Sequence, residues 1–173
     1  AYLSWTPTGT SGGRTKFTYS GWLKVSEFST SDGFYFLTAP HTTNQNGSLL
    51  YIGGDNRIAG QFRTYSTGTQ GAVDATFTSN MLVRDPSAWY HIVFAYDSTA
   101  AETSRMKLWV NGVSQSFNSV DWPSASNLQY IGSNNDHLIG RWLISSHANT
   151  NGYMADVYFI DGQALDADDF GSF

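Results

Sequence analysis

Short runs of aromatic and β-branched residues recur along the whole 173-residue chain, and glycine, asparagine, aspartate, serine or proline ends each run. Runs of this kind are typical of β-strands, and the residues that end them are typical of turns. Many strands at short spacing favour an all-β fold, here a jelly-roll β-sandwich of two antiparallel sheets. The expected strands are residues 16–25, 33–39, 48–54, 57–65, 72–78, 89–97, 105–117, 128–132, 137–144 and 152–162.

Two dipeptides mark tight turns, Asn111-Gly112 and Asp161-Gly162. Asparagine or aspartate followed by glycine is preferred in two-residue hairpin turns, because both positions adopt a positive φ. We therefore expect a hairpin tip at each dipeptide. Residues 164–170 are the one segment with a helical pattern, and we expect a single capped turn there.

The segment from residue 106 to residue 110 shows the alternation of a half-buried strand. Its three apolar residues occupy the even positions, and Lys107 and Trp109 occupy the odd ones. Because successive side chains point to opposite faces of a strand, Trp109 is expected on the outer or concave face. An aromatic ring in that position is a candidate ligand contact.

His91 lies within residues 89–97, one of the most apolar runs of the chain. Both sets of alternating side chains in this run are largely apolar, which indicates a central strand covered on both faces. A histidine there can donate through one ring nitrogen and accept through the other. We interpret His91 as a framework residue rather than a catalytic base or a metal ligand.

The composition argues against several classes of partner. Charged residues are 13% of the chain, the net charge is −5 and the basic residues are scattered, so no nucleic-acid partner is expected. Apolar stretches are far shorter than the roughly 20 residues of a membrane-spanning helix, so no membrane insertion is expected. The chain has no cysteine, and neither a disulfide framework nor a thiolate metal site is available to it.

The length favours one domain over two. Ala1 begins the chain without an initiator methionine or a charged and apolar leader. We therefore expect residues 1–173 to form a single domain, excised from a longer chain or left by processing.

Three stretches in order carry a resemblance to a known family: DPSAWYHIVFAYDS (85–98), RMKLWVNGV (105–113) and GYMADVYFIDGQALDADDFGSF (152–173). They resemble the laminin G-like branch of the concanavalin A-like lectin/glucanase superfamily. The last stretch and the opening residues are most similar to versions in structural proteins of tailed bacteriophages. The resemblance implies a lectin-like fold, a framework role for Trp89 and His91, and a virion or extracellular location.

An enzyme of this superfamily would be a glycoside hydrolase. Retaining hydrolysis needs two carboxyl groups about 5 Å apart, usually on one strand face. The chain has only two glutamates, Glu27 and Glu102, and they fall in separate expected loops. We therefore expect no enzymatic activity and no cofactor.

We consider a calcium site because relatives in this superfamily often bind calcium through Asp and Asn oxygens and backbone carbonyls at the rim of the sandwich. The candidate ligands are Asn134, Asn135 and Asp136 in one turn and Asp55 and Asn56 in another. Turns are built from the same residue types. The expectation is therefore no metal site.

Carbohydrate recognition pairs an exposed aromatic plane with amide and carboxylate groups that hydrogen-bond to hydroxyls. The alternative for each aromatic residue is a place in the core or an interface. The candidate ligand-binding residues are Trp109, Trp122, Tyr130, Asn134, Asn135, Asp136, Arg141 and Trp142.

The function expected from the sequence is recognition without chemistry, by a module on a virion or cell exterior that binds surface carbohydrate. Adhesion would be weak at each site and strong through many copies. The alternative is a purely structural decoration or fibre domain, whose partners are other virion proteins or further copies of the same chain in a homo-oligomer.

Overall fold

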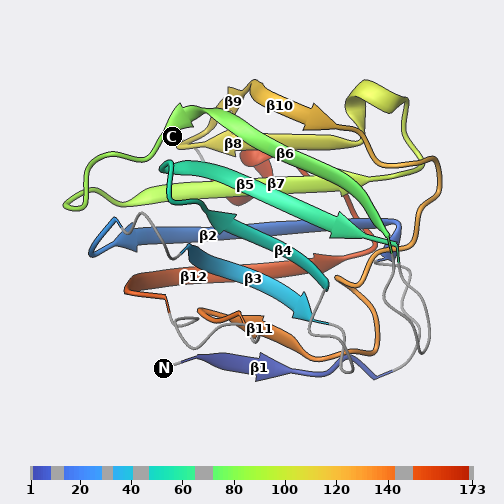
Figure 1. The fold of residues 1–173 in the computed structure, drawn as a ribbon, viewed down its shortest axis with the longest axis horizontal. Helices are drawn as coiled ribbons and strands as arrows, with labels where there is room; N and C mark the ends of the chain where they lie inside the picture. The colour runs from blue at the N-terminus through green and yellow to red at the C-terminus, as the bar shows by residue number, and fades with distance from the viewer. Residues whose placement is uncertain are drawn as a thin grey trace.

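The computed structural model describes residues 2–8, 14–28, 33–40, 47–64, 72–142 and 150–171. It is an all-β sandwich of two antiparallel sheets (Figure 1), which confirms the fold class expected from the sequence. The seven-stranded sheet has the order β1-β11-β3-β4-β5-β6-β10, and the five-stranded sheet has the order β12-β2-β7-β8-β9. No helix within the described ranges is long and apolar enough to cross a membrane.

Strand bounds follow the sequence pattern closely, and β2 coincides with an expected strand at both ends. The seven-stranded sheet comprises β1 (Leu3–Trp5), β3 (Phe34–Pro40), β4 (Gly47–Ile52), β5 (Arg57–Arg63), β6 (Val73–Leu82), β10 (Phe117–Asp121) and β11 (His137–Ile139). The five-stranded sheet comprises β2 (Lys16–Val25), β7 (Tyr90–Asp97), β8 (Met106–Val110), β9 (Val113–Gln115) and β12 (Gly152–Asp161). Two short 3-10 helices are η2 (Glu102–Ser104) and η3 (Ala167–Phe170).

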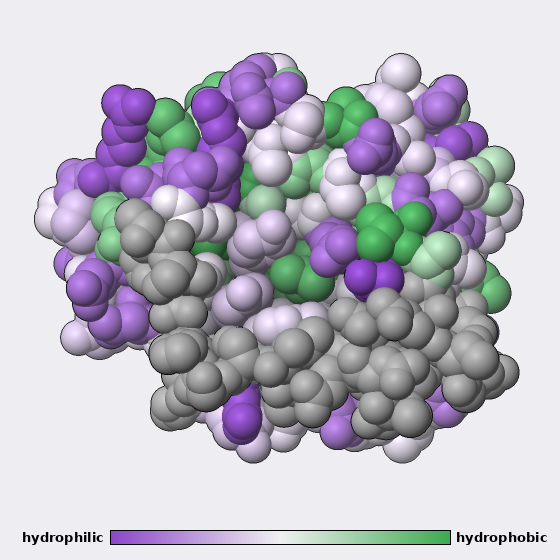
Figure 2. Space-filling model, in the orientation of Figure 1, coloured by the Kyte–Doolittle hydropathy of each residue, from purple (hydrophilic) through white to green (hydrophobic). Residues whose placement is uncertain are grey.

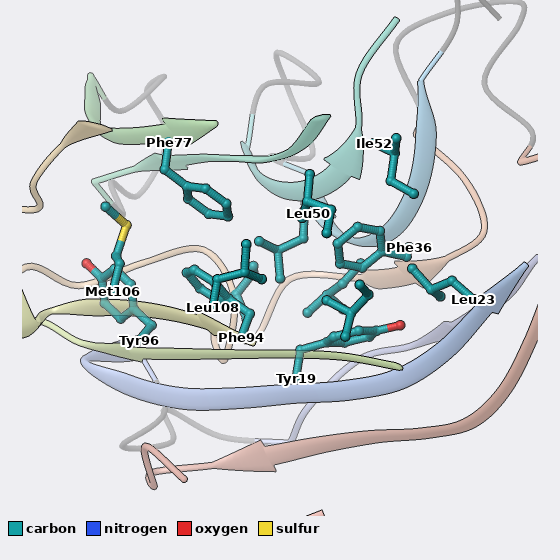
Figure 3. Packing of buried hydrophobic residues seen from close by; sticks show 14 of the residues in the cluster. Tyr19, Leu23, Phe36, Leu50, Ile52, Phe77, Phe94, Tyr96, Met106 and Leu108 are labelled. Atoms are coloured by element: carbon teal, nitrogen blue, oxygen red, sulfur yellow. The ribbon is translucent and has the colours of Figure 1, made fainter. Parts of the chain in front are cut away.

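Alternate side chains of the two sheets meet in an aromatic core (Figure 3). Phe94 of β7 stacks on Phe62 at 5.5 Å and on Phe77 at 5.0 Å between ring centroids, and both partners belong to the facing sheet. Phe17 of β2 stacks on Tyr96 of the neighbouring strand β7 at 5.3 Å. Stacked aromatic pairs add to the free energy gained by burying their area. This packing holds the two sheets together in a chain without cysteine.

The central strand is β7, as expected, and all its residues except Asp97 are buried. His91 is 3% exposed, its Nε2 is hydrogen-bonded to Ser20 Oγ at 2.9 Å, and its ring lies 5.0 Å from that of Trp22. Its backbone N–H donates to Asn111 Oδ1 at 2.8 Å. These contacts agree with the framework interpretation of His91.

The expected strand at residues 128–132 is wrong. This segment makes only one isolated bridge, between Thr64 and Gln129. Gln129 Nε2 donates to Tyr96 Oη at 2.8 Å, and Gln129 Oε1 accepts from Ser48 Oγ at 2.9 Å. Tyr130 and the residue after it are fully buried. The apolar pattern therefore reflects a loop inserted into the core rather than a sheet partner.

Other bounds also differ from expectation. The expected strand at 105–117 is three shorter segments, since β8 and β9 turn at Asn111-Gly112 and β10 begins at Phe117. Positive φ values of 50° and 77° confirm that turn. The strands β1 and the greater part of β10 were not expected, because their sequences are too short or too polar to carry a strand pattern. The expected strand at 137–144 is β11, three residues long, and residues 143 and 144 lie outside the described residues.

The hairpin expected at Asp161-Gly162 is also wrong, although Gly162 has a φ of 76°. No strand follows within the residues described up to position 171. Instead the chain turns back across β2, where Thr18 Oγ1 donates to the Gln163 carbonyl at 2.9 Å and accepts from Leu165 N–H at 2.8 Å. The 3-10 helix η3 follows, visible as the red coil behind β7 and β8 in Figure 1.

A capping box begins η3, which confirms the capped turn expected at residues 164–170. The Asp166 carboxylate accepts from Asp168 N–H, and the Asp169 carboxylate accepts from the Asp166 N–H. These two bonds satisfy backbone donors at the start of the helix. The C-terminal segment is thereby fixed against the outer face of the five-stranded sheet.

Glycine at position 60 is required by close packing. A Cβ atom built there would lie 2.4 Å from Phe77 Cε1 and 3.0 Å from Phe62 Cε2, both in the aromatic core. We expect Gly60→Ala to reduce the free energy of unfolding by about 1–3 kcal/mol, the usual cost of overpacking. Urea denaturation measures this difference. Gln61→Ala on the same strand is the control, and an equal effect of both substitutions would contradict the packing argument.

A second buried histidine connects β11 to the loop before it. His137 Nε2 accepts from Gly132 N–H at 2.8 Å, so the hydrogen is on Nδ1, which donates to the Asn135 carbonyl at 2.8 Å. Trp5 of β1 packs on the ring at 4.9 Å. Burial lowers the pKa of His137 to about 4, against smaller opposing effects of the Asn135 carbonyl and the Asp136 and Asp161 carboxylates.

This shift makes stability depend on pH. Because the pKa of His137 is lower in the folded state, its contribution is complete above about pH 6.5 and is lost as the pH falls toward 4. We expect the loss to reach about 3 kcal/mol. Comparison of wild type with His137→Gln by denaturation at several pH values isolates it, since the variant lacks the titrating group. Parallel pH profiles of the two proteins would contradict the assignment.

Candidate functional site

The outer face of the five-stranded sheet contains a groove beside Trp109. Lys107 and Trp109 point outward from β8, as the alternation predicted, and they pair across the strands with Ala95 and Val93 of β7. These neighbours are small, so the Trp109 ring stays half-buried rather than covered. The C-terminal segment forms the opposite side, and the groove has a volume of about 160 Å³. Its lining is Ala95, Asp97, Ala100, Ser104, Lys107, Trp109, Ala164, Leu165 and Asp166.

Charged groups surround the aromatic ring in this Trp109 groove. Asp97 Oδ2 forms an ion pair with Lys16 Nζ at 2.9 Å, and Asp97 Oδ1 accepts from Thr99 N–H at 2.9 Å. Partial burial opposes ionisation, but the Thr99 hydrogen bonds and the nearby Lys16 hold the pKa of Asp97 below its usual range. Asp97 is therefore a charged acceptor at neutral pH.

The groove combines groups that can bind a polar ring. An indole plane can stack on an apolar ring face, while the Asp97 and Asp166 carboxylates and the Lys107 amine can bond to hydroxyls. Both carboxylates already accept hydrogen bonds from their own turns. The low pKa of Asp97 makes it a poor proton donor.

The other candidate residues from the sequence do not join Trp109. Trp122 is half-buried in a separate hollow of about 400 Å³ at the β9 and β10 side of the sandwich, where its ring meets Phe117 edge-on at 5.8 Å. Tyr130 has no exposed surface, which corrects its assignment as a ligand contact, because its ring is part of the core.

Trp142 lies on the opposite sheet from Trp109. It is 8% exposed and packs with Leu49, Tyr35 and Tyr51, and its ring stacks on Tyr35 at 6.2 Å. So little of the Trp142 plane is accessible that it is a poor stacking surface. Figure 2 shows this outer face of the seven-stranded sheet, on which hydrophilic and neutral residues predominate where the surface is described.

The remaining candidates lie at the β1 and β11 edge. The Arg141 guanidinium is 4.7 Å above the ring of Tyr2. Asn134 and Asp136 are exposed and Asn135 is half-buried in the loop before β11, where Asp136 accepts from Thr6 Oγ1. Residues 128–142 are close in sequence, yet the fold divides them among the core, one sheet face and this edge.

Two of the residues weighed as calcium ligands, Asp55 and Asp136, have hydrogen-bond partners. Asp55 accepts from Arg57 N–H at 3.2 Å and lies 3.6 Å from the Arg57 guanidinium, and the Asp136 carboxylate is bonded to Thr6. Within the described ranges, no group of three or more histidine, aspartate or glutamate residues is placed to hold a metal ion.

Comparison with known proteins agrees with this architecture. Residues 1–169 match a laminin G family model described as the concanavalin A-like lectin/glucanases superfamily. The chain belongs to this superfamily. A comparison of the chain with curated proteins found no match.

Several solved structures share the fold of this chain at low sequence identity. The carbohydrate-binding module CBM40 of the Ruminococcus gnavus IT-sialidase, bound to α2,6-sialyllactose, has a TM-score of 0.61 at 16% identity, with 91% of this chain and 82% of that chain covered. Domains LG4-5 of the mouse laminin α1 chain give 0.59 at 14% identity, with 95% and 40% covered. The heptameric SAP-like pentraxin of Limulus polyphemus gives 0.56 at 14% identity, with 87% and 65% covered. The chain thus spans less than two thirds of the pentraxin and laminin chains.

Proposed function

We propose that this domain is a non-catalytic carbohydrate-recognition module and that Trp109 is its contact plane. The observation that carries the proposal is an outward-facing indole in a groove lined by Asp97, Lys107 and Asp166. This combination of a flat apolar surface with donors and acceptors suits a sugar ring, which has an apolar face and hydroxyl groups at its edges.

The neighbouring proteins support recognition rather than catalysis. CBM40 is described as bound to sialyllactose, and it shares the sandwich fold. The absence of chemistry also rests on the sequence, in which Glu27 and Glu102 are the only glutamates. Glu27 follows β2 and Glu102 begins η2, so the two do not alternate on one strand face as a hydrolytic pair would.

The size of the groove points to weak binding at each site. Cavities that enclose a drug-sized ligand measure roughly 300–1,000 Å³, and the Trp109 groove is smaller, so it fits about one ring of a longer glycan. Weak sites become effective when many copies act together. We propose that the domain is displayed in many copies on a cell or virion exterior. The similarity of the C-terminal stretch to structural proteins of tailed bacteriophages supports a location on a virion.

A glycan array tests the proposal with the purified domain presented as multimers, in calcium and in chelator. We expect reproducible binding to a defined class of sugar that persists in chelator, because the site needs no metal. Trp109→Ala should reduce this binding about threefold to tenfold through loss of the stacked plane, with an unchanged melting temperature.

Leu128→Ala is the matched control, since Leu128 is an exposed apolar residue that does not line the groove. Wild-type binding that Trp109→Ala leaves intact would contradict the role of Trp109. No binding by wild type across a broad array would contradict the recognition function and favour the structural alternative, in which the domain binds other protein subunits.

A further inference from the structure

A second surface lies on the same outer face as the Trp109 groove, beyond η3. Tyr153 of β12 pairs with Lys24 of β2, and Leu23 pairs with Tyr90 of β7. Continuing this register by one residue places Trp89 opposite Lys24. Trp89, Lys24 and Tyr153 therefore form one row across three strands, which we name the aromatic row.

The rings of the aromatic row are accessible. Trp89 is 41% exposed and Tyr153 is 64% exposed. Adjacent strands are about 4.8 Å apart, so the backbones that carry these two residues are about 10 Å apart, a span that a disaccharide covers. In the next row, half-buried Trp22 packs on His91 at 5.0 Å, and its partner on the other side is the small side chain of Ala155. Trp22 therefore presents a half-buried ring, held in place by His91, beside the aromatic row; we call this ring the floor of the row.

A β-bulge in β12 places a second tyrosine on this face. The register shifts between Ala155 and Tyr158, and Asp156 in the bulge has a φ of 48°, unusual for a residue other than glycine. Tyr153 and Tyr158 are five positions apart and would face opposite sides of a regular strand. The bulge brings both outward, and Tyr158 is 52% exposed. Bulges are common where a side chain is redirected for function.

The chemistry of the surface favours a glycan over a protein partner. The large exposed apolar side chains here are all aromatic, whereas the exposed aliphatic ones found among the described residues lie elsewhere. These are Leu3 on β1, Val73 on β6, Val113 on β9 and Leu128 in a loop. Separate aromatic planes with polar neighbours suit sugar stacking better than a continuous apolar interface.

The charges of the surface favour a neutral glycan over an acidic one. The charge of Lys24 reaches Asp85, whose pKa is lowered mainly by the Ser87 side-chain hydrogen bond and to a small extent by Lys24. Asp156 is exposed in the bulge beside the row. Because the Asp85 and Asp156 carboxylates oppose the charge of Lys24, an anionic ligand gains little attraction here.

We infer that the aromatic row, with Trp22 as its floor, binds a neutral oligosaccharide of at least two rings that lies across β7, β2 and β12. This inference rests on the proposed recognition function and names a ligand class for the face that also contains Trp109. The helix η3 separates the two surfaces, since Phe170 at its end packs on Tyr158 at 6.3 Å.

Affinity electrophoresis tests the inference with the purified domain in gels that contain a neutral glucan, a neutral mannan or an acidic uronan. We expect wild type to be retarded by a neutral polysaccharide and not by the uronan. Trp89→Ala and Tyr153→Ala should each weaken the retardation about threefold to tenfold, as expected for loss of one stacked plane. Leu128→Ala is the control, because Leu128 is exposed in a loop and does not belong to the row.

The outcomes separate this inference from the proposed function. If Trp109→Ala weakens binding and the two row variants do not, the recognition function stands and the aromatic row is overturned. If the row variants weaken binding and Trp109→Ala does not, the row is supported and the groove is not the contact. Retardation by the uronan alone overturns the neutral ligand. No retardation of wild type in any gel overturns the aromatic row, whereas the recognition function is decided by the glycan array.

Discussion

Burial of β7 on both faces is the constraint on which the rest of this molecule depends. Its inward side chains, Phe94 and Tyr96 among them, stack on aromatic residues of both sheets and hold the sandwich together without disulfides. Its outward side chains, Val93 and Ala95, are small and lie beneath the C-terminal segment and beside Trp109. The same strand therefore supports the core on one side and the candidate binding surface on the other.

The sequence predicts the strands well because most of them have one clear periodicity. Residues 16–25 and the turn at Asn111-Gly112 agree with the structure because their residue types favour one local conformation. The segment 128–132 misleads because a buried loop and a buried strand have the same apolar composition, and only its long-range partners, Ser48 and Tyr96, distinguish them. Gly162 has the positive φ expected of a turn, but the sequence could not show that the chain then crosses a sheet face instead of forming a hairpin.

The candidate site was predictable only in part, for the same reason. Trp109 was found by strand alternation, which is a local signal. Asp97 and Asp166 were not, because they join it only when the C-terminal segment folds back over Thr18. The aromatic row was missed because the resemblance assigned Trp89 a framework role, whereas its side chain is 41% exposed. Tyr130 and Trp142 were grouped with Trp109 because they are close in sequence, but Tyr130 lies in the core and Trp142 lies on the other sheet.

The central claim is that recognition takes place on the outer face of the five-stranded sheet. Titration of the ¹⁵N-labelled domain with the glycan that it binds tests this most directly, through the indole N–H signals of its six tryptophans. The account predicts shifts of the Trp109 signal and of those of Trp22 and Trp89, with the Trp142 and Trp122 signals unchanged. Shifts of Trp142 or Trp122 without these would place the ligand elsewhere and contradict the account.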